Sequence, residues 1–176
     1  MISPEIILLN QASKIKCAGV KLSMKHSRIW KIMKIEEFRV RIKVQAPAPE
    51  VWNELVTWKN QGKWMALTRV EASHVGPADS RIGTTIEAFT GIGKFGILDR
   101  MKVIEWNPHK FCKVDHYGRF IKGIGTFELT EENGVTVFDW FEEIKAPKAL
   151  LLLLKPFILI AVYASLRKFA RGFSSS

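Results

Sequence analysis

Apolar and charged residues alternate strictly in the segment from Phe38 to Val44. The apolar positions are Phe38, Val40, Ile42 and Val44, and the charged positions between them are Arg39, Arg41 and Lys43. Successive side chains of a β-strand point to opposite faces of a sheet, so this period of two predicts a half-buried strand. One face of the strand is expected to contact the core.

The residues after this strand predict short helices. The segment Ala46-Pro47-Ala48-Pro49 ends the alternation, and Pro49 suits the first turn of a helix because no amide donor is needed there. Apolar residues then recur at helical spacing, at Val51, Trp52, Leu55 and Val56. Gly62 ends this pattern before Trp64. We therefore expect two short helices after the first strand.

Six further stretches of strand-like residues follow, separated by Gly, Pro, Asn and Asp residues typical of turns. We expect strands near 67–75, 82–90, 94–106, 110–118, 120–130 and 135–145. The last segment, 148–172, predicts a long helix. This order of elements is typical of an α+β fold with about seven antiparallel strands, rather than of alternating β-α-β units.

The positions of the turns predict which residues face each other across the later strands. If Asn107-Pro108 is the centre of a hairpin, Asp99 lies opposite His116. Continuing the count through the next two turns places Gly125 opposite Trp140. All three hairpins agree on which residues share a face, and a slip of one residue would reverse every assignment.

These registers divide the later strands into an apolar face and a charged face. The apolar face contains Phe95, Ile97, Met101, Val103, Val114, Phe127, Phe138 and Trp140. The opposite face contains a predicted ladder of alternating charge, formed by Arg100, Asp115, Lys122 and Glu143. Opposite charges directly across strands stabilise a sheet by about 0.2–1 kcal/mol each. We expect the apolar face to lie against the C-terminal helix.

The net charge of +10 is concentrated at the two ends of the chain. Residues 1–36 carry seven Lys or Arg and two acids, and residues 145–176 carry six Lys or Arg and no acid. No groove-reading helix or RNA-stacking motif is present, which argues against nucleic acid as a partner. Basic ends beside apolar residues instead favour peripheral contact with an anionic membrane.

The apolar segment 149–166 is interrupted by Lys155 and Pro156. A membrane span needs about 20 apolar residues, so we expect a buried helix here and keep membrane anchoring as a weaker alternative. The two cysteines, Cys17 and Cys112, are too few for a disulfide framework, and no metal-ligand spacing is present. Together with the lack of a convincing signal peptide, this favours a cytoplasmic protein without a metal or cofactor.

In this order and spacing, the motifs resemble the START-like superfamily known as SRPBCC, and within it the polyketide cyclase/dehydrase and lipid-transport group. The resemblance covers about residues 37–172. It rests on Val44 to Trp52, Leu55, Trp58, Trp64, Gly83-Thr84, Trp106-Asn107-Pro108, Gly123, Gly125, Phe127, Trp140, Glu142 and Glu143. It implies a helix-grip fold, in which a curved antiparallel sheet wraps around a long C-terminal helix.

The resemblance assigns 36–173 to a START-like ligand-binding domain and leaves 1–35 as an N-terminal extension. Members of the superfamily bind lipids, quinones, hormones or polyketides in an internal cavity, and some are enzymes. A fold shared by so many ligands does not decide the function of one chain.

Asp99 and His116 form a predicted acid–imidazole pair on the apolar face, and Glu142 lies on the same face. Such groups in a cavity can carry out general acid–base catalysis, orient a ligand, or satisfy each other structurally. Trp64, in a loop-like position, is expected to close the mouth of the cavity. The expected cavity residues are Trp64, Phe95, Ile97, Asp99, Met101, Val114, His116, Phe127, Phe138, Trp140 and Glu142.

Two functions fit this pattern. In the first, the protein is a carrier or binding protein for a hydrophobic small molecule that is lipid-, quinone- or polyketide-like. In the second, it is a cyclase or dehydratase-type enzyme that uses Asp99, His116 or Glu142 as catalytic residues. An apolar cavity with few polar groups suits both functions, and we favour the first.

Overall fold

The computed structural model describes residues 33–74 and 80–173, except for the side chains of 150 and 153–159. Residues 1–32 of the expected N-terminal extension therefore lie outside the described residues. Its last three residues, 33–35, belong to the first strand, which begins at Met33 and pairs with the last strand as far as Pro147. The start of this strand has no strict alternation, so the sequence pattern detects only its second half.

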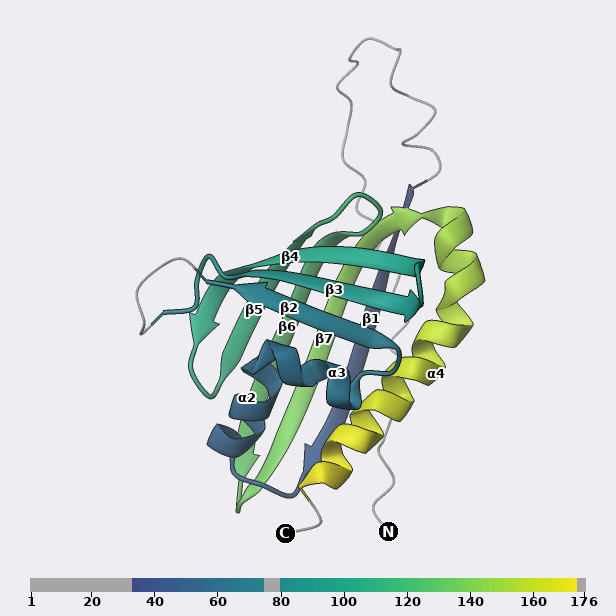
Figure 1. Ribbon diagram of the computed structural model, residues 1–176. Helices are drawn as coiled ribbons and strands as arrows, with labels where there is room; N and C mark the ends of the chain where they lie inside the picture. Colours follow the sequence, from purple (N-terminus) through teal and green to yellow (C-terminus); the bar gives the residue numbers. More distant parts are fainter. Residues whose placement is uncertain (1–32, 75–79, 174–176) are drawn as a thin grey trace, which may run out of the picture.

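Within the described residues, seven antiparallel strands and a long C-terminal helix make up the fold, as predicted (Figure 1). The strands are β1 Met33–Val44, β2 Thr68–Ser73, β3 Thr85–Ile92, β4 Phe95–Asn107, β5 Phe111–Tyr117, β6 Lys122–Glu132 and β7 Val135–Pro147. The helices are α2 Ala48–Val56, the 3-10 helix η1 Trp58–Asn60, α3 Gln61–Trp64 and α4 Lys148–Gly172.

The sheet has the strand order β1-β7-β6-β5-β4-β3-β2, so the first and last strands are neighbours. In Figure 1, β2 to β4 cross in front of β6, β7 and β1, which shows how strongly the sheet curves. The helices α2, α3 and α4 lie on its concave side. This is the helix-grip architecture expected from the sequence.

The core forms where α2, α3 and the end of α4 contact the sheet. On α2, Val51 and Leu55 are fully buried, and the ring of Trp52 lies 4.9 Å from that of Trp106 in β4. On α4, Leu166 and Phe169 are buried in the same cluster. Burying these faces stabilises the helices, because each apolar side chain removed from water contributes about 1.5–3 kcal/mol.

The hairpin between β4 and β5 departs from its predicted register. Met101, rather than Asp99, lies opposite His116. The loop contains three residues, with His109 in the left-handed region at φ 65°, and a bulge follows between Val103 and Glu105. Together these features shift the pairing by two residues. An even shift leaves every side chain beyond the bulge on its predicted face.

The next two hairpins are shifted in the same way. Gly125 lies opposite Val114 and Glu142, whereas Trp140 lies opposite Phe127. The predicted pairing of Gly125 with Trp140 is therefore wrong, because the β6–β7 turn is centred on Asn133-Gly134, one residue later than the residue pattern indicates. The glycine instead leaves space beside Glu142.

The predicted charge ladder is also wrong as a set of direct pairs. Arg100 lies opposite Glu87 of β3, and its Nε donates to Glu87 Oε1 at 2.8 Å. Lys122 lies opposite Lys145 rather than Glu143. The charges remain on the outer face, but the shift of two residues changes their partners.

Helix α4 is buried on one side and exposed on the other. Leu166 is 1% exposed, whereas Leu152 is 77% and Ile160 68% exposed. Within the described ranges, no helix is both long enough and apolar enough to cross a membrane.

Candidate functional site

A cavity of about 660 Å³ lies between the concave face of the sheet and α4. Its walls come from all strands of the sheet, from the segment around η1 and α3, and from α4. Its volume is in the range typical of sites for small organic molecules. Most side chains on its walls are apolar, and Asp99, His116 and Glu142 are the acidic or basic ones among the described residues.

Most of the residues expected from the sequence lie on this wall. They are Phe95, Ile97, Asp99, Met101, Val114, His116, Phe127, Trp140 and Glu142. They come from β4, β5, β6 and β7, where the predicted face assignment holds despite the shifted register.

Trp64 and Phe138 do not line the cavity, so Trp64 does not close its mouth as expected. Both are buried in the core against Phe169 of α4, with ring centroids at 4.9 Å for Trp64 and 6.0 Å for Phe138. Trp64 lies at the end of α3 and turns inward, because this short helix lies against α4.

Several residues of the cavity wall were not predicted from the sequence. They include Phe38 and Val40 of β1, Gln61, Met65 and Thr68, Ile86, Ala88 and Thr90 of β3, and Ala161, Val162 and Ser165 of α4. The alternation in β1 places Phe38 and Val40 on one face, so these two residues could have been predicted from the sequence. The contributions from α4 depend on how the helix is rotated against the sheet, and no local pattern specifies that.

We call Asp99, His116 and Glu142 the inner cluster. The imidazole of His116 is 4% exposed and lies between the two carboxylates. Its Nδ1 is 2.8 Å from Asp99 Oδ2 in a hydrogen bond, and its Nε2 is 2.9 Å from Glu142 Oε2. The second contact lacks hydrogen-bond alignment and is an ion pair only. The predicted contact between Asp99 and His116 is thus present.

Gly125 allows Glu142 to reach His116 across β6. A Cβ at this glycine would lie 2.9 Å from both carboxylate oxygens of Glu142 and 3.0 Å from His116 Nε2. Real Cβ atoms essentially never approach other atoms more closely than 3.0 Å, so a side chain here would displace the cluster. The strand therefore needs glycine at this position for the three groups to meet.

His116 is positively charged at neutral pH. Burial disfavours the imidazolium, but its hydrogen bond to Asp99 and its charge attraction to both carboxylates outweigh burial and raise the pKa of His116 to about 10. The Nδ1–H group therefore donates to Asp99. Trp140 Nε1 donates to Glu142 Oε1 at 2.6 Å and orients that carboxylate.

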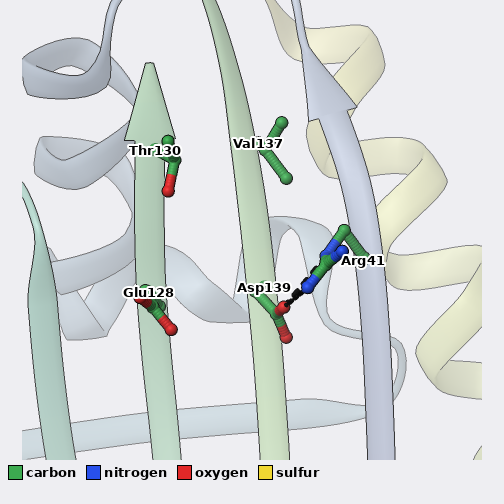
Figure 2. A pocket seen from close by; sticks show the side chains of 5 residues that line it. All are labelled: Arg41, Glu128, Thr130, Val137 and Asp139. Atoms are coloured by element: carbon green, nitrogen blue, oxygen red, sulfur yellow. Dashed lines mark hydrogen bonds and ion pairs between the residues drawn. The ribbon is translucent and has the colours of Figure 1, made fainter. Parts of the chain in front are cut away.

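A second, smaller hollow lies on the outer face of the sheet and has a volume of about 280 Å³. Figure 2 shows its side chains on β1, β6 and β7, namely Arg41, Glu128, Thr130, Val137 and Asp139. Asp139 accepts from Arg39 Nε at 2.8 Å and from Arg41 Nε at 2.9 Å. We call Arg39, Arg41 and Asp139 the outer cluster.

Both oxygens of Asp139 are occupied by guanidinium donors. Burial opposes ionisation of this carboxyl, but the two arginines prevail and lower the pKa of Asp139. The outer cluster is therefore a satisfied ion-pair network that joins β1 to β7. In the described part of the chain, no group of His, Cys, Asp or Glu is arranged to hold a metal ion.

Several solved structures have a similar fold. The aromatase/cyclase ZhuI from Streptomyces sp. R1128 is 12% identical, with a TM-score of 0.65 over 80% of this chain and 94% of that chain. The di-domain aromatase/cyclase StfQ from the steffimycin biosynthetic pathway is 12% identical, with a TM-score of 0.64 over 85% of this chain and 53% of that chain.

Norcoclaurine synthase from Thalictrum flavum, in complex with dopamine and hydroxybenzaldehyde, is 14% identical. Its TM-score is 0.56 over 88% of this chain and 95% of that chain. No protein-family model and no curated protein matches the chain. At these identities the similarity concerns the fold, and the chain has the helix-grip fold of these aromatase/cyclases.

Proposed function

We propose that this protein binds a hydrophobic small molecule in the cavity, as a carrier or binding protein. The observation that carries the proposal is an apolar cavity of about 660 Å³ with its polar groups gathered at one cluster. An apolar ligand would gain roughly 25 cal/mol per Å² of surface removed from water. A lipid-, quinone- or polyketide-like molecule has the required chemistry.

The state of His116 supports binding over catalysis. An imidazolium held between two carboxylates has no free lone pair, so it is a poor general base at neutral pH. A general base works best when its pKa lies near the pH at which it operates.

A second candidate function is a cyclase or dehydratase-type reaction. Its support is the position of the inner cluster on the cavity wall and the similar fold of two aromatase/cyclases. In this case His116 would act as a general acid, and Asp99 or Glu142 would take a proton from the substrate. Substitution of these residues would then abolish turnover, whereas in a binding protein it would only change affinity.

The binding proposal is tested with the neutral fluorescent probe N-phenyl-1-naphthylamine. Val114→Trp places a large side chain on the cavity wall and should abolish the rise in probe fluorescence. Asp115→Trp, one residue away on the outer face of β5, is the matched control and should leave the fluorescence unchanged. Equal probe binding by both folded variants would overturn the proposal. If only Val114→Trp loses probe binding, native mass spectrometry of protein from its own cells would identify the ligand.

We also propose a cytoplasmic protein in peripheral contact with an anionic membrane. The support is the excess of Lys and Arg at both ends of the sequence, together with the exposed Leu152 and Ile160 on α4. Each basic residue near an anionic surface contributes about 1 kcal/mol, and salt screens this attraction. Co-sedimentation with phosphatidylserine vesicles should therefore fall as salt rises. Binding that persists unchanged at high salt would contradict the electrostatic contribution.

A further inference from the structure

The charges of the inner cluster do not cancel. Asp99 and Glu142 are two carboxylates, and His116 supplies one positive charge between them. With both carboxylates ionised, the cluster has a net charge of −1. Among the described wall residues, no Lys or Arg compensates for it. A net charge beside an apolar cavity is costly unless a partner neutralises it or donates hydrogen bonds to it.

Two acceptor atoms of the cluster are also incompletely bonded. Asp99 Oδ1 and Glu142 Oε2 are buried and accept no hydrogen bond from any described residue. Two nearby donors are already used, because His116 Nδ1 donates to Asp99 Oδ2 and Trp140 Nε1 donates to Glu142 Oε1. The third, His116 Nε2, lies 2.9 Å from Glu142 Oε2 but is not aligned to donate to it. A buried acceptor left unsatisfied costs about 1–3 kcal/mol, and more when it is charged.

We propose that the inner cluster recognises a hydrogen-bond-donating group at the polar end of the cavity ligand, either a protonated amine or a hydroxyl, and discriminates against a carboxylate. This inference rests on the proposed binding function and specifies its ligand class. Asp99 Oδ1 and Glu142 Oε2 are the atoms that would accept from the ligand. The apolar walls around them would hold its hydrocarbon or aromatic body.

Charge explains the discrimination. An ammonium group neutralises the cluster and brings up to three donors, and a hydroxyl brings one donor without charge. A ligand carboxylate brings only acceptors and would compete with Asp99 and Glu142 for one imidazolium. It would also change the net charge of the site from −1 to −2, where screening by water is weak. The expected order of affinity is therefore amine, then alcohol, then carboxylate.

The test compares four probes that share one aromatic body and differ at its end. They are 2-(2-naphthyl)ethylamine, 2-(2-naphthyl)ethanol, 2-naphthylacetate and 2-ethylnaphthalene, each titrated at neutral pH by calorimetry or by quenching of tryptophan fluorescence. We expect the amine and the alcohol to bind at least tenfold more tightly than the carboxylate. A tenfold difference corresponds to about 1.4 kcal/mol.

Asp99→Asn removes one negative charge with little change in shape, so the preference for the amine over the carboxylate should fall severalfold. Asp115→Asn makes the same change on the outer face of β5 and should leave the preference intact. Glu142→Gln provides a second variant if Asp99→Asn does not fold.

The possible outcomes separate the two proposals. If 2-ethylnaphthalene binds but the amine, alcohol and carboxylate bind equally, the inference is overturned and the binding function stands. If the preference is present but Asp99→Asn and Glu142→Gln leave it unchanged, the cluster is not its source and the inference is overturned. If none of the four probes binds, both the inference and the binding function fail.

Discussion

The inner and outer clusters use similar side chains on opposite faces of one sheet, with different results. In the outer cluster one carboxylate, Asp139, accepts hydrogen bonds from two guanidinium groups on both of its oxygens. In the inner cluster two carboxylates share one imidazole, and two of their oxygens lack donors. The outer cluster is complete without a ligand, whereas the inner cluster is not.

This difference separates a structural ion-pair network from a candidate binding site. Buried polar groups in native proteins are generally hydrogen-bonded, so each exception requires an explanation. The outer cluster needs none, and its role is to join β1 to β7. The exceptions in the inner cluster lie on the wall of a cavity, where a ligand can supply the missing donors.

The largest expected effect comes from His116→Ala. It removes the positive charge between two half-buried carboxylates and leaves both uncompensated. Breaking a buried ion pair in this way typically costs about 3–5 kcal/mol of unfolding free energy, which urea denaturation would measure. A loss below about 1 kcal/mol would mean that the negative charge of the carboxylates does not need His116 to compensate it.

Asp139→Ala should destabilise the protein by about 2–3 kcal/mol, because it removes the acceptor of three charge-assisted hydrogen bonds. Binding of 2-ethylnaphthalene by the folded variant should not change, since the outer cluster faces away from the cavity. Glu128→Ala is the control, because Glu128 is an exposed residue opposite Asp139 on the neighbouring strand. Its effect should stay within about 0.5 kcal/mol. Altered probe affinity in Asp139→Ala alone would show that the outer cluster affects binding in the cavity.

The clusters should lose stability at opposite ends of the pH range. The pKa of His116 is raised from 6.5 to about 10, so its contribution is fully present below pH 6.5 and is lost as pH rises toward 10. The slope attributable to one such group is at most about 1.4 kcal/mol per pH unit. The pKa of Asp139 is lowered, so its contribution is present above the pKa of the unfolded carboxyl and is lost as pH falls through the folded value.

Urea denaturation from pH 3 to pH 10 measures both effects. The stability difference between the wild type and His116→Gln should shrink between pH 6.5 and 10, and the difference between the wild type and Asp139→Asn should shrink in acid. Parallel curves for the wild type and His116→Gln would show that the imidazole has the same pKa in the folded and unfolded chains.

The smallest expected effect comes from Gly125→Ala. The added methyl group would contact the ends of Glu142 and His116, which are side chains that can move, so we expect a loss of about 1 kcal/mol. The preference for amine over carboxylate probes should fall together with the stability. Gly172→Ala is the matched control, because a Cβ there meets no atom within 4 Å. An unchanged preference in Gly125→Ala would mean that the discrimination between the probes does not depend on the exact position of Glu142.

The sequence alone determined the order of the elements, the α+β fold class and the face on which most side chains lie. These follow from local periodicity, which each segment contains by itself. The inner position of Asp99, His116 and Glu142 was predictable for this reason. Their face survived because the errors in register were an even number of residues.

Only the tertiary structure decided which residues touch. The width of the β4–β5 loop and the bulge between Val103 and Glu105 set the register, and the sequence pattern specifies neither. The shifted register then placed Gly125, rather than Gly123, opposite Glu142. The outer cluster was missed altogether, because Arg39 and Asp139 are 100 residues apart in the sequence. Such a contact exists only when the sheet brings its first and last strands together, and no local pattern of polar and apolar residues encodes that meeting.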